Sequence, residues 1–299
     1  IDNMFDEQWT IQAVRDWGDW QLEPYIHDQE ERLAQIDYLL TGMMDWNYAQ
    51  LANNLNTVLE DEKRLRFMVA VRAIKGGQPV QYALGHAAFY GREFNVDRRV
   101  LIPRQETEEL VEWVLNDHKA TGSAQRVLDI GTGSGAIAVT IGAERPTWDV
   151  TGADISADAL VVAQTNADQF AKQVKFIESD LFSQATGQYD IIISNPPYIS
   201  EAERDVMDES VIMYEPDLAL FADDEGLALY KQMAAQLLTY LAPNGTAYFE
   251  IGYQQGPALL AVFGELPGVS VALRQDMSGH DRMIKVSREA SRVWQRRKF

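Results

Sequence analysis

The tetrapeptide Asn195-Pro196-Pro197-Tyr198, which follows the apolar run from Ile191 to Ser194, has side chains suited to holding a planar NH2 group. An amide or arylamine nitrogen is a poor nucleophile because its lone pair is delocalised, so a catalyst must aim that lone pair at the electrophile. The Asn195 side-chain oxygen and the Pro196 carbonyl can each accept one N–H. The two prolines restrict the backbone, and Tyr198 offers a flat face to the planar group. By itself the tetrapeptide is also compatible with a turn that ends a strand.

A glycine-rich turn follows an earlier apolar run, in the order Val127-Leu128-Asp129-Ile130-Gly131-Thr132-Gly133-Ser134-Gly135. Glycines let the chain turn tightly and let a ligand approach the backbone without Cβ atoms in the way. A dinucleotide-binding loop would carry its third glycine one position later, so the spacing favours a nucleoside without a pyrophosphate over NAD. A tight turn without a ligand is the alternative.

Acidic residues stand at the ends of the next two apolar runs. Asp154 ends the run from Val150, where a carboxylate can accept hydrogen bonds from both ribose hydroxyls. Asp180 and Leu181 follow the run Val174–Ile177, where Asp180 could accept from an adenine amino group while Leu181 packs on the ring; an exposed loop aspartate is the alternative. Because the carboxyl ends of parallel strands share one crevice, these residues and the glycine-rich turn are expected to form a single nucleoside site.

The elements that must position these residues alternate between strand and helix from Arg126 onward. The helical stretches include Ala136–Ala143 and Leu227–Leu241, and the runs of strand type are Val127–Ile130, Val150–Ala153, Val174–Ile177, Ile191–Ile193 and Ala247–Ile251. Such alternation predicts an α/β domain with a parallel sheet covered on both faces. The runs Val269–Leu273 and Met283–Val286 predict an antiparallel hairpin that closes the sheet.

The chain before this domain is expected to be helical from Glu7 to Lys75, where Gly76-Gly77-Gln78-Pro79 ends the last helix. The helical expectation rests on apolar residues at helical spacing, namely Leu33, Ile36 and Leu40, and then Leu55, Val58, Leu59, Leu65, Met68 and Val69. A β-type stretch, Ala87–Ile102, indicates a hairpin linker. A helix is expected next, because Glu106, Glu108 and Glu109 suit the dipole at its N-terminus.

Composition excludes several kinds of site. The chain has no cysteine, which excludes disulfides and thiolate metal sites, and its 4 histidines lack metal-ligand spacing, so no metal is expected. A formal net charge of -19 argues against a protein that grips nucleic acid. It is compatible with a basic protein partner, and solubility alone is the alternative explanation. No apolar run approaches the roughly 18 residues of a membrane span, and the acidic start is unlike a secretory signal, so a cytoplasmic location is expected.

The motifs together resemble the release-factor glutamine methyltransferases (HemK/PrmC type), a family of class I S-adenosylmethionine-dependent enzymes. The resemblance covers roughly positions 28 to 287. Besides the motifs above, it rests on Gln78-Pro79-Val80-Gln81-Tyr82, Gly85, Phe89, Leu101–Leu110, Ser194–Ile199, Tyr214-Glu215-Pro216, Phe249-Glu250-Ile251-Gly252 and Asp281-Arg282. Members transfer methyl from S-adenosylmethionine to the glutamine of the Gly-Gly-Gln loop of class 1 peptide-chain release factors, leaving S-adenosylhomocysteine.

The resemblance implies a Rossmann-like seven-stranded domain preceded by a small helical domain and a β-hairpin linker. The implied boundaries are 1–78 for helical recognition, 79–103 for the linker, 104–287 for the methyltransferase domain and 288–299 for a basic tail. Asn195, Pro196 and Tyr198 would be catalytic, and Asn195 to Tyr198 would bind the glutamine. The cofactor would contact Gly131, Thr132, Gly133, Ser134, Gly135, Asp154, Asp180, Leu181 and Asn195.

Two positions depart from the family pattern. Members commonly have proline where Gln105 stands, which affects loop rigidity, and often tryptophan where Leu181 stands, which affects stacking at the adenine.

Three other functions stay open at this point. A ribosomal-protein glutamine methyltransferase usually carries a Pro-Arg-Ser-Pro type segment, where this chain has Pro103-Arg104-Gln105-Glu106-Thr107. Adenine methylation of nucleic acid uses the same Asn-Pro-Pro-Tyr logic, but the acidic balance counts against it. A binding module without catalysis would keep the fold and would not need Asn195.

Overall fold

The computed structural model describes residues 9–119 and 123–289 of the 299-residue chain. The described residues form two compact units. One contains the residues up to Ala87 together with Asp208–Tyr214, and the other contains Ala88–Met207 and the chain from Glu215 onward. Most of the expected basic tail, residues 290–299, lies outside the described residues.

The larger unit is built on a seven-stranded sheet with the strand order β5-β4-β3-β6-β7-β9-β8. Strands β3 to β7 pair in parallel, whereas β9 pairs antiparallel with both β7 and β8, which confirms the antiparallel closure expected from the sequence. The strands are β3 (Arg126–Ile130), β4 (Asp149–Asp154), β5 (Lys175–Glu178), β6 (Tyr189–Ser194), β7 (Leu241–Glu250), β8 (Val269–Gln275) and β9 (Asp281–Arg288).

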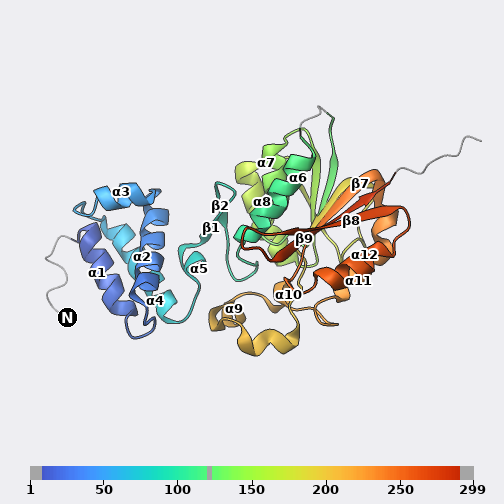
Figure 1. Ribbon diagram of the computed structural model, residues 1–299. Helices are drawn as coiled ribbons and strands as arrows, with labels where there is room; N and C mark the ends of the chain where they lie inside the picture. Colours follow the sequence, from blue (N-terminus) through green and yellow to red (C-terminus); the bar gives the residue numbers. More distant parts are fainter. Residues whose placement is uncertain (1–8, 120–122, 290–299) are drawn as a thin grey trace, which may run out of the picture. The chain divides into compact units, whose positions relative to one another are not determined.

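Helices cover both faces of this sheet (Figure 1). Ile191 and Ile193 of β6 pack into the cluster with α6, α7 and α8, while Ile192 packs into the cluster with α11 and α12. Successive side chains of a strand point to opposite faces, so a strand buried on both sides reads as a continuous apolar run. The helices are α6 (Gln105–Asp117), α7 (Ala136–Glu144), α8 (Ala157–Phe170), α11 (Ala228–Tyr240) and α12 (Gly256–Gly264).

The chain order reverses between β3 and β6, which are neighbours at the centre of the sheet. From β3 the chain runs outward through β4 and β5, then returns to β6 on the other side of β3. The Ser194 hydroxyl donates to the Ile130 carbonyl at 2.7 Å and ties the two strand ends together. Ligands of open α/β sheets bind at such a switch point, so this topology brings the glycine-rich turn and the Asn-Pro-Pro-Tyr segment to one crevice.

Between β6 and α11 the chain forms three short helical segments. They are η1 (Glu201–Val206), α9 (Glu209–Tyr214) and α10 (Asp217–Leu220). Of these, α9 belongs to the helical unit, where the Tyr214 hydroxyl donates to the Gly76 carbonyl at 2.5 Å.

The smaller unit is helical, as expected, with α1 (Ile11–Leu22), α2 (Gln29–Met44), α3 (Tyr48–Asn53), α4 (Asp61–Lys75) and α5 (Val80–Leu84). Polar side chains begin the first three helices: Thr10 and Asp28 accept backbone N–H bonds, and Asn47 forms a capping box with Gln50. Such caps satisfy N–H groups that the first turn of a helix leaves without partners. None of the helices within the described ranges combines the length and apolarity needed to cross a bilayer.

The apolar positions Leu65 and Val69, which helped to indicate helix α4, do not belong to its buried face. Leu65 and Val69 are 58% and 69% exposed, and the helix packs instead through Phe67, Ala70, Val71 and Ile74. Both sets have helical spacing, so periodicity alone does not say which of them faces the core.

The predicted linker contains a hairpin, in which β1 (His86–Phe89) pairs with β2 (Arg92–Asn95). Its turn residues Tyr90 and Gly91 have φ values of 49° and 73°, as a two-residue hairpin turn requires. The strand character ends at Asn95, short of the expected Ile102, and helix α5 occupies the start of the linker. Phe89 and Phe94 are buried in the same core cluster as α6 to α8, which anchors the hairpin to the larger unit.

Candidate active site

The loop after β3 is shaped by a buried carboxylate. One Asp129 side-chain oxygen accepts from the Thr132 hydroxyl at 2.6 Å and from the Ala138 N–H at 3.2 Å, holding the loop against the start of α7. Burial raises the pKa of Asp129 to about 7. No role was expected for Asp129 from the sequence, although an acidic residue inside an apolar run is a signal for one.

The glycines of this loop serve two different purposes. A Cβ on Gly133 would meet no atom within 4 Å, and one on Gly131 would meet only the Asn195 carbonyl oxygen at 4.0 Å. Both residues line a cavity of about 200 Å³ and keep its wall free of side chains. A Cβ on Gly135 would lie 3.1 Å from Val139 and 3.2 Å from Ala163, so this glycine allows helix packing instead.

Asp154, at the end of β4, enters the same cavity with its carboxylate already oriented. Its two oxygens accept from the Gly133 N–H at 2.8 Å and the Ser156 N–H at 2.9 Å. Burial raises the pKa of Asp154. Each carboxylate oxygen has a second lone pair, so both can still accept from the hydroxyls of a ligand.

The cavity gathers most of the residues expected at the cofactor. Those lining it are Gly131, Gly133, Asp154, Asp180, Leu181 and Asn195, and Pro196 and Pro197, expected at the substrate glutamine, line it as well. Three expected residues do not line it: the Thr132 hydroxyl bonds to Asp129, Ser134 is buried with its carbonyl accepting from Asn166, and Gly135 packs on α8. The side-chain-free wall at Gly131 and Gly133 and the two acidic residues, Asp154 and Asp180, fit a nucleoside such as that of S-adenosylmethionine.

Two segments that the site prediction did not include complete this cavity. Val100 and Leu101 line it from the chain before α6, and Pro216 and Leu218 line it from the segment at α10. Buried Glu215 joins the segments, because its carboxylate accepts from the Ile102 N–H at 3.2 Å and pairs with Arg104. Arg104 and Glu215 both lie in segments that resemble the family, but they are 111 positions apart, so their ion pair could not be predicted from the sequence.

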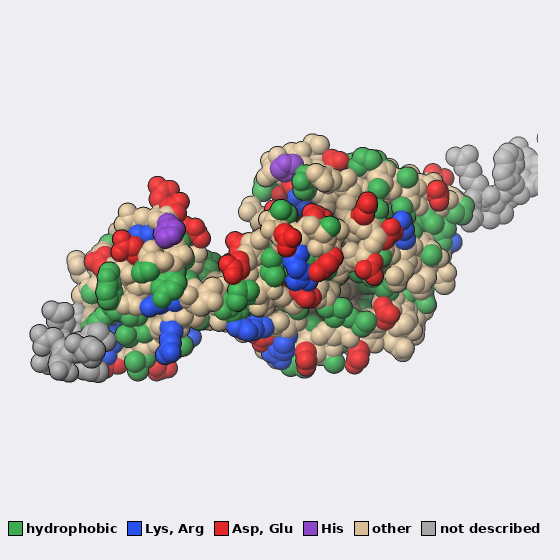
Figure 2. Space-filling model, turned by 90° about the horizontal axis from the view of Figure 1, so that it is seen from below, with side chains coloured by type: hydrophobic (Ala, Val, Ile, Leu, Met, Phe, Trp, Pro, Cys, Tyr) green, Lys and Arg blue, Asp and Glu red, His purple; other side chains and the backbone are tan. Residues whose placement is uncertain are grey.

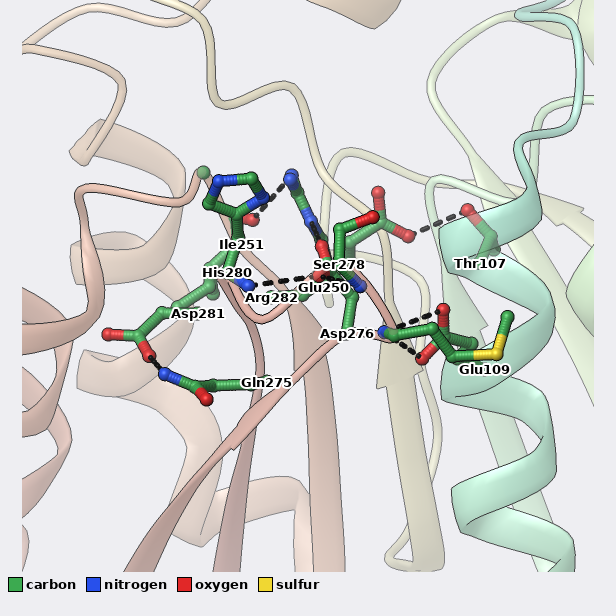
Figure 3. A network of polar contacts seen from close by, with 12 residues as sticks. Thr107, Glu109, Glu250, Ile251, Gln275, Asp276, Ser278, His280, Asp281 and Arg282 are labelled. Atoms are coloured by element: carbon green, nitrogen blue, oxygen red, sulfur yellow. Dashed lines mark hydrogen bonds and ion pairs between the residues drawn. The ribbon is translucent and has the colours of Figure 1, made fainter.

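A chain of hydrogen bonds lies behind the Asn-Pro-Pro-Tyr segment. The Asn195 Nδ2 donates to the Thr107 hydroxyl oxygen at 3.2 Å, and the Thr107 hydroxyl donates to Glu250 Oε2 at 2.6 Å. The Tyr198 hydroxyl donates to Glu250 Oε1 at 3.3 Å. Figure 3 shows Thr107 of α6 and Glu250 of β7 pointing toward each other. Both residues lie in motifs that carry the family resemblance, but no role was expected for either of them.

Burial shifts the pKa values of Glu250 and Tyr198, the two titratable groups in this set of hydrogen bonds. Burial raises the pKa of Glu250 to about 7, while its bonds to Thr107 and Tyr198 and the charge of Arg282 oppose that rise. Burial and the neighbouring Glu250 charge raise the pKa of the Tyr198 phenol, so Tyr198 keeps its proton and is no general base.

A second cavity, of about 530 Å³, lies beside Tyr198. Its lining includes Gly252 and Arg282, whose guanidinium pairs with Asp276 at 3.0 Å and donates to the Ile251 carbonyl at 3.3 Å (Figure 3). Asn195, Pro196 and Pro197 line the smaller cavity and Tyr198 lines the larger one. The tetrapeptide therefore contributes to the walls of both.

On the face shown in Figure 2, acidic side chains are scattered over both units, and Lys and Arg form only a few small groups. Within residues 9–119 and 123–289 no group of three or more His, Asp and Glu side chains is arranged to hold a metal ion. The lining of the smaller cavity therefore combines the backbone of Gly131 and Gly133 with the side chains of Asp154, Asp180 and Asn195.

The strand order with its antiparallel closing pair, the glycine-rich loop after β3 and the Asn-Pro-Pro-Tyr segment after β6 define a class I methyltransferase. Two family models match the chain: "PrmC N-terminal domain" over residues 15–85 and "Methyltransferase small domain" over residues 107–215.

Curated relatives agree with these matches. The chain is 42% identical over 253 residues to the release factor glutamine methyltransferase of Lactococcus lactis, spanning 84% of this chain and 93% of the relative. It is 40% identical over 260 residues to that of Streptococcus pneumoniae, spanning 86% and 92%. The chain belongs to the release factor glutamine methyltransferase family.

The crystal structure of a methyltransferase from Pyrococcus furiosus shares the fold, with a TM-score of 0.50 and 14% identity over 77% of this chain and 100% of that one.

Proposed function

We propose that this protein transfers a methyl group from S-adenosylmethionine to the side-chain amide nitrogen of the glutamine in the Gly-Gly-Gln loop of class 1 release factors. The observation that carries the proposal is the Asn195 amide, whose NH2 end is bonded to Thr107 at the edge of a nucleoside-type cavity. Its oxygen is then the end available to accept an N–H from a substrate amide. The family membership supports the identity of the acceptor.

The residues that would hold the cofactor are those of the smaller cavity. Gly131 and Gly133 would supply a wall of bare backbone, Asp154 would accept from the ribose hydroxyls, and Asp180 would accept from the adenine amino group beside Leu181. When bound, S-adenosylmethionine supplies the methyl group as an electrophile.

The substrate amide is oriented by the tetrapeptide. The Asn195 Oδ1 and the Pro196 carbonyl each accept one N–H of the glutamine, which holds the nitrogen lone pair toward the cofactor cavity, and the Tyr198 ring supports the planar group. Tyr198 keeps its proton and does not act as a base. The proton on the substrate nitrogen becomes acidic as that nitrogen is alkylated and is released to water.

The helical unit has no part in this chemistry, and we assign it to recognition of the release factor. The proposed division is 1–78 for this recognition domain, 79–103 for the linker, 104–287 for catalysis and 288–299 for the basic tail. Residues 1–75 carry 7 Lys and Arg against 14 Asp and Glu, a balance that suits a basic, ribosome-contacting protein.

Mass spectrometry of a purified release factor after incubation with enzyme and S-adenosylmethionine tests the proposal. We expect the mass of one methyl group on the glutamine of its Gly-Gly-Gln peptide. Asn195→Ala enzyme should leave that peptide unmodified at equal enzyme concentration while calorimetry shows nearly unchanged cofactor binding, because Asn195 orients the acceptor.

Two further substrates distinguish the alternatives in the same assay. Methylation of a ribosomal protein or of adenine in DNA, with the release factor left unmodified, would overturn the proposal. Full activity of the alanine variant would refute the role of Asn195 while leaving the substrate assignment intact.

A further inference from the structure

We infer that Thr107 and Glu250 are positioning residues that set which end of the Asn195 amide faces the substrate. The inference rests on the proposed function, because the oriented amide matters only if its oxygen accepts an N–H from the acceptor. Neither residue lines the cofactor cavity, so the pair acts through Asn195.

The direction of each hydrogen bond in the chain is determined by the group at its end. An ionised carboxylate can only accept, so Glu250 obliges the Thr107 hydroxyl to donate its single hydrogen at 2.6 Å. The Thr107 oxygen is left with lone pairs alone, which accept from the Asn195 Nδ2 at 3.2 Å. The Asn195 Oδ1 is thereby turned away from Thr107.

The two groups are held firmly enough to impose this direction. Thr107 is 4% exposed in the first turn of α6, and Glu250 is 1% exposed at the end of β7, so neither can exchange its partner for bulk water. The Tyr230 hydroxyl donates to the Glu250 backbone carbonyl at 2.6 Å and holds the strand end in place. Because burying an unpaired polar group is costly, the hydrogen-bonded arrangement is strongly favoured.

Protonation of Glu250 reverses the direction of the hydrogen bonds that join Glu250, Thr107 and Asn195. A neutral carboxyl donates to the Thr107 oxygen, which frees the Thr107 hydrogen to donate to the Asn195 oxygen and turns the Asn195 NH2 toward the substrate. Two NH2 groups would then face each other, and the acceptor would lose its hydrogen bond. The charged and titratable groups that act on Glu250 are Arg282 of β9, Glu106 of α6 and Tyr198.

The sign of the pH effect follows from the raised pKa of about 7 at Glu250, against its ordinary value of 4.5. Turnover should fall on the acid side with an apparent pKa near 7. The stability of the fold should change with pH in the opposite direction to turnover. Because the pKa of Glu250 is raised in the folded state, its contribution to stability is fully present below pH 4.5 and is lost as the pH rises to about 7.

The first test compares Thr107→Val, Thr107→Ser and the control Thr165→Val, which removes an exposed hydroxyl bonded within α8. For Thr107→Val we expect kcat for release-factor methylation to fall roughly 10- to 100-fold, while KM and calorimetric cofactor affinity stay within about twofold. The serine variant should recover most of the loss. If the kcat of Thr107→Val equals that of the Thr165→Val control, the inference is overturned.

The second test uses Glu250→Gln and does not depend on how well Thr107→Val folds. The glutamine has the same shape and does not titrate, so the acid limb of kcat should be absent. As the pH rises from about 5 to about 8, the melting temperature of this variant should increase relative to that of the wild type. An acid limb unchanged in Glu250→Gln would overturn the inference. A wild-type enzyme that leaves the release-factor glutamine unmodified would instead overturn the proposed function.

Discussion

Asp154 is oriented by the protein's own backbone, because the Gly133 and Ser156 N–H groups hold its two oxygens in the cavity. A preoriented carboxylate costs little to order when it accepts further hydrogen bonds from a ligand. The bond to Gly133 also couples Asp154 to the glycine-rich loop, so the residue affects two parts of the cofactor site.

The Asp154→Ala substitution should weaken S-adenosylmethionine binding by about 1–3 kcal/mol, the scale for leaving buried polar groups without partners. Isothermal titration calorimetry measures the change, with Asp158→Ala on the exposed first turn of α8 as the matched control. Equal affinity in the two variants would remove Asp154 from the site. Circular dichroism should show a folded protein, because Asp154 lies at a strand end and not in the core.

Among the secondary-structure elements, helix α4 has two sets of apolar residues at helical spacing, and tertiary packing determines which set is buried. Val71 is fully buried in the helical core with Ile36 and Phe67, whereas Val69, two positions earlier, is 69% exposed. The two valines share a helix and a residue type, so they differ mainly in burial.

Val71→Ala should lower the free energy of unfolding by roughly 2 kcal/mol through lost burial and the cavity left behind. Val69→Ala should change it by less than about 0.5 kcal/mol, since exposed substitutions rarely do more. Urea denaturation followed by circular dichroism compares the pair. Similar losses for both variants would contradict the burial assigned to this face of α4.

At the scale of the whole molecule, the dominant feature is the formal net charge of -19. Long-range electrostatic attraction between this negative charge and a basic partner speeds their association. Salt screens the attraction once the Debye length falls to about 10 Å, near 0.1 M salt.

We expect kcat/KM for the full-length enzyme and a release factor to fall as salt rises past about 0.1 M, because association slows. The value of kcat at saturating release factor should stay nearly constant and serves as the internal control. Steady-state kinetics over a sodium chloride series measures both. A kcat/KM that is insensitive to salt would show that charge does not guide the encounter.

The alternation of strands and helices in the larger unit could be predicted from the sequence, and so could the glycine-rich loop, Asp154 and the Asn-Pro-Pro-Tyr segment. These features depend on local rules, because side-chain period, turn residues and the acidic ends of strands are properties of neighbouring residues. The crevice they share was also predictable, because the carboxyl ends of parallel strands lie along one edge of a sheet.

Three features depend on tertiary packing: the apolar face of α4 that is buried, the link that Glu215 makes between two segments of the cavity wall, and the hydrogen bonds that connect Asn195 to Thr107 and Glu250. Thr107 and Glu250 are 143 positions apart and come from a helix and a strand with no local pattern in common. Their meeting depends on the strand order and on how α6 packs against the sheet. Contacts between distant residues are set by the packing of whole elements, which no local spacing in the sequence encodes.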